Sequence, residues 1–232
     1  LLIEDVIFKN TYAASSGGAI FFNSYTYYVG RTSSVEVRRV LIDTSFAVNG
    51  GSIYIGNVNE NMIFDDIDIW NTSADNSGGA MYISSGTNNL LLSNIRVRNA
   101  NATSKGAALY FGGDQQDILI KSCRVEDSHS FYAGGAIYFD SGISGITIND
   151  SHFADTSASY YGGHLYFYSD TSNVVVMASN LSHGYAGEKG GSIYISEDAV
   201  VPTTPVVGGN NEALAAVARF LVVFFPAAAC AG

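Results

Sequence analysis

The chain has 232 residues, of which 47% are hydrophobic and 14% are charged. This balance allows a sizeable buried core and excludes a disordered chain. The formal net charge is −10 and no basic run offsets it, which argues against binding to nucleic acids. The two cysteines, Cys123 and Cys230, have neither a metal-ligand spacing nor a disulfide pattern, and we expect no metal or cofactor.

The first ten residues, LLIEDVIFKN, place Ile3, Val6 and Phe8 in register with an apolar strand that recurs later in the chain. A β-sheet that began here would present an unpaired edge. We therefore expect the sequence to be a segment of a longer chain, or its first coil to be covered by a neighbouring molecule.

A glycine motif, such as GGAIYFDSG from Gly134, recurs along the chain up to residue 195. The first glycines of its copies are Gly17, Gly50, Gly78, Gly106, Gly134, Gly162 and Gly190. From Gly50 onward each copy follows the previous one by 28 residues, whereas Gly17 precedes Gly50 by 33. A fixed period of this length is typical of a solenoid, in which each repeat buries its apolar face against its neighbours.

Each motif continues into a short strand in which an aromatic residue stands between two apolar ones, as in Ile53, Tyr54 and Ile55. Side chains alternate between the two faces of a strand, so the aromatic residues should share one face. Their column reads Phe21, Tyr54, Tyr82, Tyr110, Tyr138, Tyr166 and Tyr194. An uncovered stripe of this kind would contact a protein or the faces of sugar rings; the alternative is a ladder that only stabilises the sheet.

Two further apolar patterns recur in each repeat, for example at Phe64 and at Ile67 with Ile69, and they predict two more strands. Three short strands per 28 residues predict an all-β parallel β-helix of about seven coils, which we place in residues 1–198. No helical periodicity interrupts the repeats up to residue 195.

The repeats also predict turns. All copies keep the first glycine, whereas Ala107 replaces the second in one copy, so we expect the first position to be the stricter one and to need positive φ. Seven residues before each first glycine lies the column Asn10, Asp43, Asn71, Asn99, Asp127, Asp155 and His183. Such side chains favour turns and can bond one another as a ladder, although an ion or ligand site is the alternative.

The stretch FKNTYAASSGGAIFF, with weaker copies such as IWNTSADNSGGAMYI and HFADTSASYYGGHLY, resembles the repeat of chlamydial polymorphic membrane proteins. The resemblance covers residues 1–195, although the period here is more regular and the Phe of the first motif varies. It implies a surface adhesin whose β-helix is right-handed and pectin-lyase-like. That fold also hosts polysaccharide lyases and hydrolases.

An enzyme of that kind would need clustered carboxylates on one face. Asp127, Asp155 and His183 are the catalytic candidates, because they would lie on consecutive coils and a neighbouring like charge raises the pKa of a carboxyl group. The competing interpretation is that these residues only extend the turn ladder.

Outward-facing charges predict ion pairs between coils, Asp68 with Arg96 and Arg98 with Glu126. Trp70 would lie over Arg98. We interpret these residues as a solvated charge ladder.

Four N-glycosylation motifs begin at Asn71, Asn101, Asn149 and Asn180 and suggest secretion in a eukaryote, although chance would produce nearly as many. Asn180 falls in an outward column, whereas Asn71 belongs to the turn ladder. If the chain is secreted by a eukaryote, we expect a sugar on Asn180 more readily than on Asn71.

After Asp198 the repeat ends in VVPTTPVVGGNN, so residues 199–232 should form a linker and an apolar cap. Asn211 could cap a short buried helix from Glu212 to Phe225. Arg219 interrupts this segment, which is too short to span a bilayer; a removed lipid-anchor signal is an alternative.

These patterns favour a structural, non-enzymatic protein at the cell surface or outside the cell: a stiff rod, a fibre subunit or an adhesin stalk. Its partners would be further copies or other subunits, end to end or side by side, with glycans as a further possibility. Any membrane contact would come through parts outside this chain. The alternatives are a polysaccharide-degrading enzyme and a carbohydrate-binding module that uses the Tyr stripe.

Overall fold

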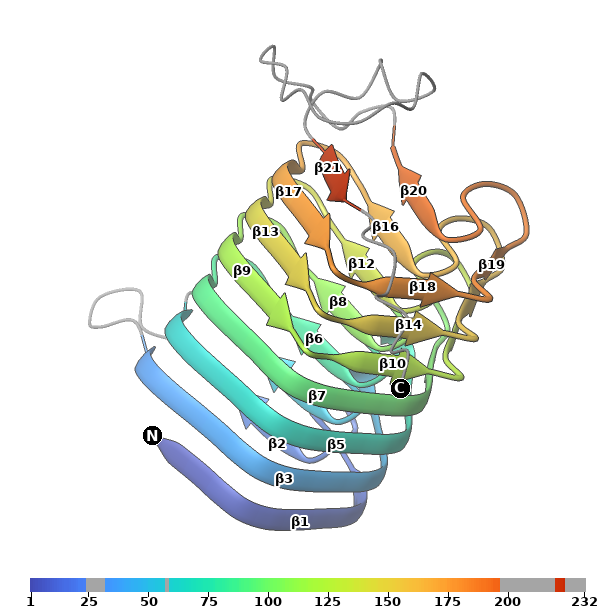
Figure 1. Cartoon of the computed structure of the whole chain (residues 1–232). Helices are drawn as coiled ribbons and strands as arrows, with labels where there is room; N and C mark the ends of the chain where they lie inside the picture. The colour runs from blue at the N-terminus through green and yellow to red at the C-terminus, as the bar shows by residue number, and fades with distance from the viewer. Residues whose placement is uncertain (24–31, 57–58, 197–219, 224–232) are drawn as a thin grey trace, which may run out of the picture.

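The computed structural model describes residues 1–23, 32–56, 59–196 and 220–223. Their strands stack coil upon coil into a parallel β-solenoid of about six turns, and the described residues contain no helix (Figure 1). The seven motif copies delimit these six turns, which is one fewer than the seven coils expected. The predicted boundary at residue 198 lies outside the described residues.

The glycine motif supplies one complete sheet, in which every strand pairs in parallel with the next at equivalent residues. Its strands are β2 (Ile20–Phe22), β4 (Ile53–Ile55), β6 (Met81–Ile83), β8 (Leu109–Phe111), β12 (Ile137–Phe139), β16 (Leu165–Phe167) and β20 (Ile193–Ile195). The 28-residue period therefore corresponds to one coil.

The second sheet wraps around the rest of each coil. Its first four coils use long bent strands: β1 (Leu2–Tyr12), β3 (Thr32–Asn49), β5 (Asn59–Ser77) and β7 (Asn88–Ala102). Later coils divide the same path into β9 (Gln116–Lys121), β10 (Arg124–Glu126) and β11 (His129–Ser130); then β13 (Ser144–Asn149), β14 (His152–Ala154) and β15 (Ser157–Ala158); then β17 (Ser172–Met177), β18 (Asn180–Ser182) and β19 (Tyr185–Ala186). The three predicted strands per repeat are therefore present, the second and third fused in the early coils, and β11, β15 and β19 add a fourth short strand that the pattern did not predict.

Left-handed residues turn the corners of the second sheet. One corner column consists of Asn61, Asn89, Asp117, Gly145 and Asn173, and the next of Asp5, Arg39, Asp66, Asn94, Ser122, Asp150 and Ala178, all with φ between 48° and 70°. Asn, Asp and Gly adopt this conformation at the lowest cost, which explains why they recur at fixed positions in each repeat.

The predicted turn column is the third of these corners, with one correction. Asn10, Asn71, Asn99, Asp127, Asp155 and His183 all have positive φ, but in the second coil Thr44 holds this conformation instead of Asp43. The register shift between Ala47 and Asn49 leaves this coil one residue shorter than its neighbour at this bend, so counting back from Gly50 gives the wrong residue.

Both glycines of the motif are constrained, for different reasons. The first has φ between 59° and 67° in every copy, which confirms the predicted conformation. At the second, a Cβ on Gly135 would lie 2.1 Å from the carbonyl oxygen of Gly163 on the next coil. The fourth copy nevertheless holds Ala107 at this position, so the coils can adjust to a methyl group there. That the first position is the stricter one stays a prediction.

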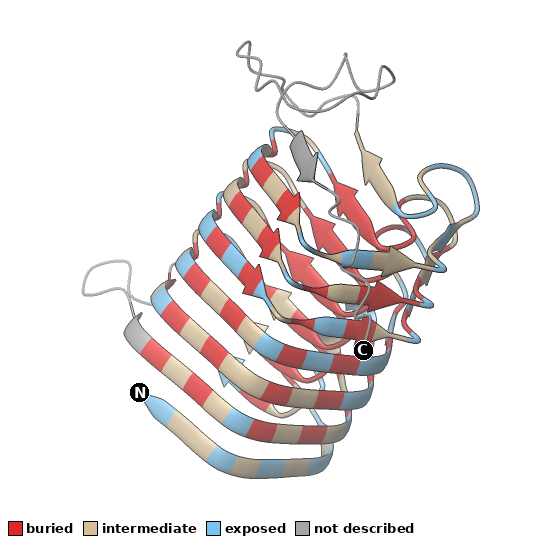
Figure 2. Ribbon diagram, viewed as in Figure 1, coloured by how far each residue is buried: buried red, intermediate tan, exposed pale blue. Residues whose placement is uncertain are grey.

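The core fills the interior of the solenoid with columns of aliphatic and Phe side chains from both sheets. Buried and exposed residues alternate along the long strands (Figure 2), as in β5, where Phe64, Ile67 and Ile69 are fully buried. Each such side chain contributes about 1.5–3 kcal/mol by leaving water.

The predicted C-terminal helix is wrong over the part that the structure describes. Residues Phe220–Val223 form β21, which pairs in parallel with β17. Consecutive valines favour strand, and the free edge of β17 offers a row of backbone partners. The rest of the segment from Glu212 to Phe225 lies outside the described residues.

Candidate functional site

The aromatic column is assembled as the repeat predicts. Each ring stacks on the ring of the next coil, with centroids 5.1 Å apart for Phe21 and Tyr54, 4.5 Å for Tyr82 and Tyr110, and 4.7 Å for Tyr138 and Tyr166. Offset stacking at these separations adds about 0.5–1.5 kcal/mol per pair to the gain from burial. The column is therefore a continuous stabilising element of the first sheet.

Of the two alternatives for this column, an open contact stripe and a stabilising ladder, the burial of its rings fits the ladder. Tyr138 is 1% exposed and Tyr166 4%, and only Phe21 at the N-terminal end is largely open. The Lys105 Nζ lies 4.6 Å from the centroid of the Tyr138 ring, and the Tyr110 hydroxyl donates to the Asp140 carboxylate. Burial raises the pKa of the Tyr138 phenol. These contacts favour the ladder interpretation over a contact stripe.

A second aromatic group lies beside the column and was not predicted. Phe131, Tyr132 and Tyr160 contact one another, and Tyr161 stacks on Tyr194 with centroids 5.2 Å apart. Phe131 and Tyr132 are exposed. The sequence signal was a pair of aromatic residues just before the motif glycines, directly so in SYYGG and one residue earlier in SFYAGG.

The catalytic candidates lie in one column but on an open corner. The side chains of Asp127, Asp155 and His183 are 47%, 59% and 78% exposed. His183 Nδ1 lies 3.3 Å from Asp155 Oδ1, whereas Asp127 accepts a hydrogen bond from Arg98 Nε at 3.0 Å. The three residues thus extend the corner ladder, and Asp127 takes its ion-pair partner from an earlier coil.

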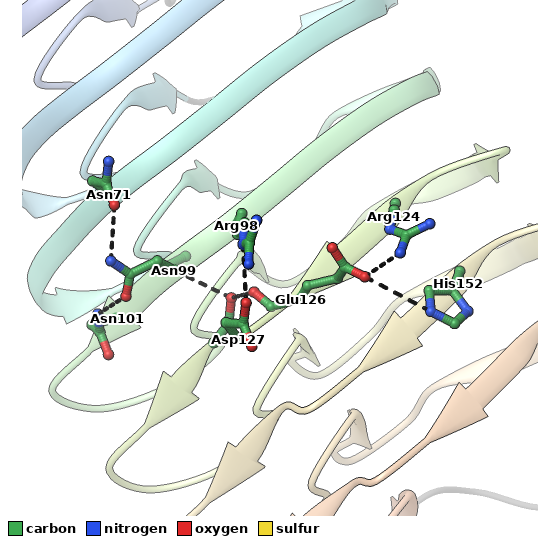
Figure 3. Close-up of polar contacts among 10 residues, drawn as sticks. Asn71, Arg98, Asn99, Asn101, Arg124, Glu126, Asp127 and His152 are labelled. Carbon is green, nitrogen blue, oxygen red and sulfur yellow. Dashed lines mark hydrogen bonds and ion pairs between the residues drawn. The ribbon is translucent and has the colours of Figure 1, made fainter.

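The amide members of this corner confirm that it is a ladder. Asn99 Nδ2 donates to Asn71 Oδ1 at 2.9 Å (Figure 3). Asn71 Nδ2 in turn donates to Asp43 Oδ1 at 3.1 Å. Each bond joins consecutive coils.

The predicted ion pairs are half right. Arg96 pairs with Asp68 as expected, and also with Asp66 at 2.9 Å. Arg98, however, pairs with Asp127, and Glu126 pairs with Arg124 instead (Figure 3). The corner at Asp127 brings its carboxylate to Arg98, a contact that strand register alone does not predict.

A shallow hollow of about 510 Å³ lies at this corner. It is lined by Trp70 and Asn71 of β5, Arg98 and Asn99 of β7, and Asp127, which follows β10. All five residues are exposed, and Figure 3 shows the four polar ones and the contacts among them. The hollow combines one large aromatic surface with fixed hydrogen-bonding groups, which is a combination suited to binding a small polar ligand.

His164 is the one fully buried histidine among the described residues. Its Nδ1 is 2.6 Å from Thr156 Oγ1, while Nε2 has no hydrogen-bond partner in the described part of the chain. Burial lowers the pKa of the imidazole to about 4. The ring is therefore neutral at physiological pH and serves packing.

The four glycosylation motifs differ in geometry. Asn180 is exposed on β18, paired with His152 of the previous coil. Asn101 is exposed on β7, and Asn149 is half-buried at the end of β13. The Asn71 side chain is held by the corner ladder on both sides. The placement of Asn180 and Asn71 thus agrees with the expected register.

The described residues contain no group of His, Cys, Asp and Glu side chains arranged to hold a metal ion. No helix in the described part of the chain could cross a membrane. Comparison with protein-family models, with curated proteins and with solved structures gives no match to this chain.

Proposed function

We propose that this chain is a structural, non-enzymatic part of an extracellular or cell-surface protein: a stiff rod, a fibre subunit or the stalk of an adhesin. The observation that carries the proposal is the unbroken register of the first sheet, in which every strand from β2 to β20 pairs with the next at equivalent residues. In a solenoid each coil contacts only its neighbours, so a continuous register and core resist bending, and copies that continue the same stack would form a stiff rod.

The repeat supports the surface location and the finer description of the fold. Its likeness to chlamydial polymorphic membrane protein repeats favours a right-handed, pectin-lyase-like β-helix used in adhesion. The acidic composition, with a net charge of −10, suits an exposed surface that does not bind polyanions. The partners would be further copies or other subunits, end to end or side by side.

Electron microscopy and analytical ultracentrifugation of the purified chain test the proposal. The six turns of one chain span only about 29 Å at about 4.8 Å per coil, so a rod requires copies stacked end to end. We expect filaments, or sedimenting species heavier than one chain of 24.6 kDa. A chain that stays monomeric at all concentrations would contradict a fibre subunit.

The enzyme alternative is tested separately, by measuring new reducing ends after incubation with acidic and neutral polysaccharides. We expect no cleavage by the wild-type chain or by the Asp155→Asn variant. Cleavage that disappears in Asp155→Asn would make the exposed corner column a catalytic site and overturn the non-enzymatic assignment.

A further inference from the structure

We propose that the hollow at Trp70 binds a neutral sugar, with the indole as the stacking surface and the surrounding polar side chains as hydrogen-bonding partners. Trp70 is the only tryptophan of the chain and is 41% exposed. In its column it lies between Asp43 and Arg98, so a large apolar ring stands alone in a charged surface. The core does not need this ring, because the adjacent Ile69 already fills the interior.

The polar groups of the hollow are held in place before any ligand arrives. Arg98 Nε donates to Asp127 Oδ2 at 3.0 Å, and Asn99 Nδ2 donates to Asn71 Oδ1 at 2.9 Å. A guanidinium has five N–H donors and a carboxamide has two, so these bonds fix the groups and leave further donors for a ligand. The second carboxylate oxygen of Asp127 can accept a hydrogen bond from a hydroxyl group.

This combination matches the chemistry of a pyranose ring. A sugar presents an apolar face of C–H groups, which packs on an aromatic ring, and an edge of hydroxyls, which donate and accept hydrogen bonds. The Arg98 charge is balanced by Asp127, and the whole chain carries a net charge of −10. A negatively charged sugar would therefore be repelled, and a neutral one is favoured.

The size of the site also favours a sugar over a protein. A hollow of about 510 Å³ lies within the range of small-ligand sites, about 300–1,000 Å³. A stable protein interface buries far more surface than five side chains provide. Because the site is open, we expect weak binding, with a Kd on the order of 1 mM.

The single tryptophan makes the test direct, because its fluorescence reports on this site alone. The chain is produced in bacteria, so that Asn71 and Asn101 carry no glycan, and is titrated with cellohexaose, xylohexaose, mannohexaose, chitohexaose and trigalacturonate. We expect at least one neutral oligosaccharide to shift the Trp70 emission to the blue and to protect it from acrylamide quenching. Trigalacturonate should have no such effect.

Two matched variants separate the site from the rest of the sheet. Arg98→Gln keeps the fluorescent residue and should weaken binding about tenfold, whereas Arg124→Gln removes an exposed arginine that pairs outside the hollow and should bind as the wild type does. Circular dichroism melting establishes that both variants are folded.

Three results would overturn the proposal: no spectral change with any neutral oligosaccharide at about 10 mM, tighter binding of trigalacturonate, or unchanged affinity in folded Arg98→Gln. The rod proposal would survive each of them, since electron microscopy of the same protein tests it independently.

Discussion

At the scale of single residues, left-handed backbone is what lets each coil close. Among the residues that the structure describes, twenty other than glycine have positive φ, and most of them are Asn or Asp at corners of the second sheet. Their short polar side chains tolerate this conformation and bond one another between coils, so most corners turn without glycine; Gly145 is an exception. The first glycine of the motif has positive φ in every copy, and there the backbones of consecutive coils lie close together.

The two motif glycines give the first prediction. Gly134→Val forces a β-branched residue to φ of 67°, and Gly135→Ala places a methyl 2.1 Å from the Gly163 carbonyl oxygen. Each should lower the free energy of unfolding by about 1–3 kcal/mol in urea titrations. The matched control is Gly191→Ala, the same position in the last coil, where the nearest atom lies 3.3 Å away.

The control should change stability by less than about 1 kcal/mol. If Gly135→Ala were as stable as Gly191→Ala, the close approach of the coils at the second glycine would be wrong.

The buried His164 predicts a pH dependence. Its pKa falls from 6.5 to about 4 on folding, chiefly by burial, although Asp155 opposes this and His152 and His183 add to it. The unfolded chain then binds a proton at His164 more tightly than the folded chain does. The stability that depends on a neutral His164 is therefore fully present above pH 6.5 and is lost as the pH falls to 4. The loss is about 3 kcal/mol.

His164→Ser is the matched variant, because Ser52 occupies the same motif position and bonds Thr72 at 2.9 Å. Urea unfolding of both proteins between pH 4 and 7 should show a steeper loss of stability in the wild type. Parallel pH profiles would mean that the imidazole is not buried.

Glycosylation gives a third prediction at this scale. When the chain is secreted by eukaryotic cells, Asn180 should be modified more fully than Asn71, whose amide group takes part in two hydrogen bonds of the ladder. Mass spectrometry of peptides measures the occupancy of each site. Full occupancy at Asn71 with none at Asn180 would contradict the assigned register.

At the scale of elements, the first sheet holds together through like residues stacked on like. The Tyr column runs along one face, while Phe111, Phe139 and Phe167 stack on the other with centroids 4.9 Å apart. The aromatic column continues through all seven strands, whereas the other column stacks Phe on Phe only from β8 to β16 and has Ile55, Ile83 and Ile195 in other coils. Similar packing therefore repeats from coil to coil.

Truncating the column tests this arrangement. Tyr138 is stacked on both sides and buried, so Tyr138→Ala should cost about 3–5 kcal/mol of unfolding free energy. Phe21→Ala, at the exposed end of the same column, should cost about 1 kcal/mol. Chemical denaturation of both variants measures the difference, and equal costs would show that the column is open along its length.

At the scale of the whole molecule, the period of the sequence was sufficient to predict the solenoid because each coil repeats the same contacts with its neighbours. It failed where one coil departs from the pattern. The shortened bend of the second coil moves the corner from Asp43 to Thr44, and no residue type marks that change. The C-terminal strand β21 was missed because apolar runs fit either a helix or a strand until an edge is available.

The site was harder to predict than the fold. Trp70 and Arg98 were recognised as outward neighbours, but the hollow needs Asp127, which a corner brings back toward an earlier coil. The repeat pattern could not predict how far the Tyr column is exposed to solvent. That depends on covering side chains such as Lys105, which come from a different part of the repeat.

The central claim, a parallel solenoid with one coil per repeat, is tested most directly by distances between spin labels. Glu36, Leu119, Thr147 and Val175 lie in one outward column, with Leu119, Thr147 and Val175 three, four and five coils from Glu36. Burial raises the pKa of the Cys123 thiol to about 12, so with Cys230→Ala only the introduced cysteines react.

Double electron–electron resonance should give distances from position 36 of about 14, 19 and 24 Å, which increase by about 4.8 Å for each added coil. The three variants report on one geometry, so a constant increment is the decisive feature. Distances that fail to increase in this order, or that change by more than about 10 Å between consecutive coils, would contradict the solenoid.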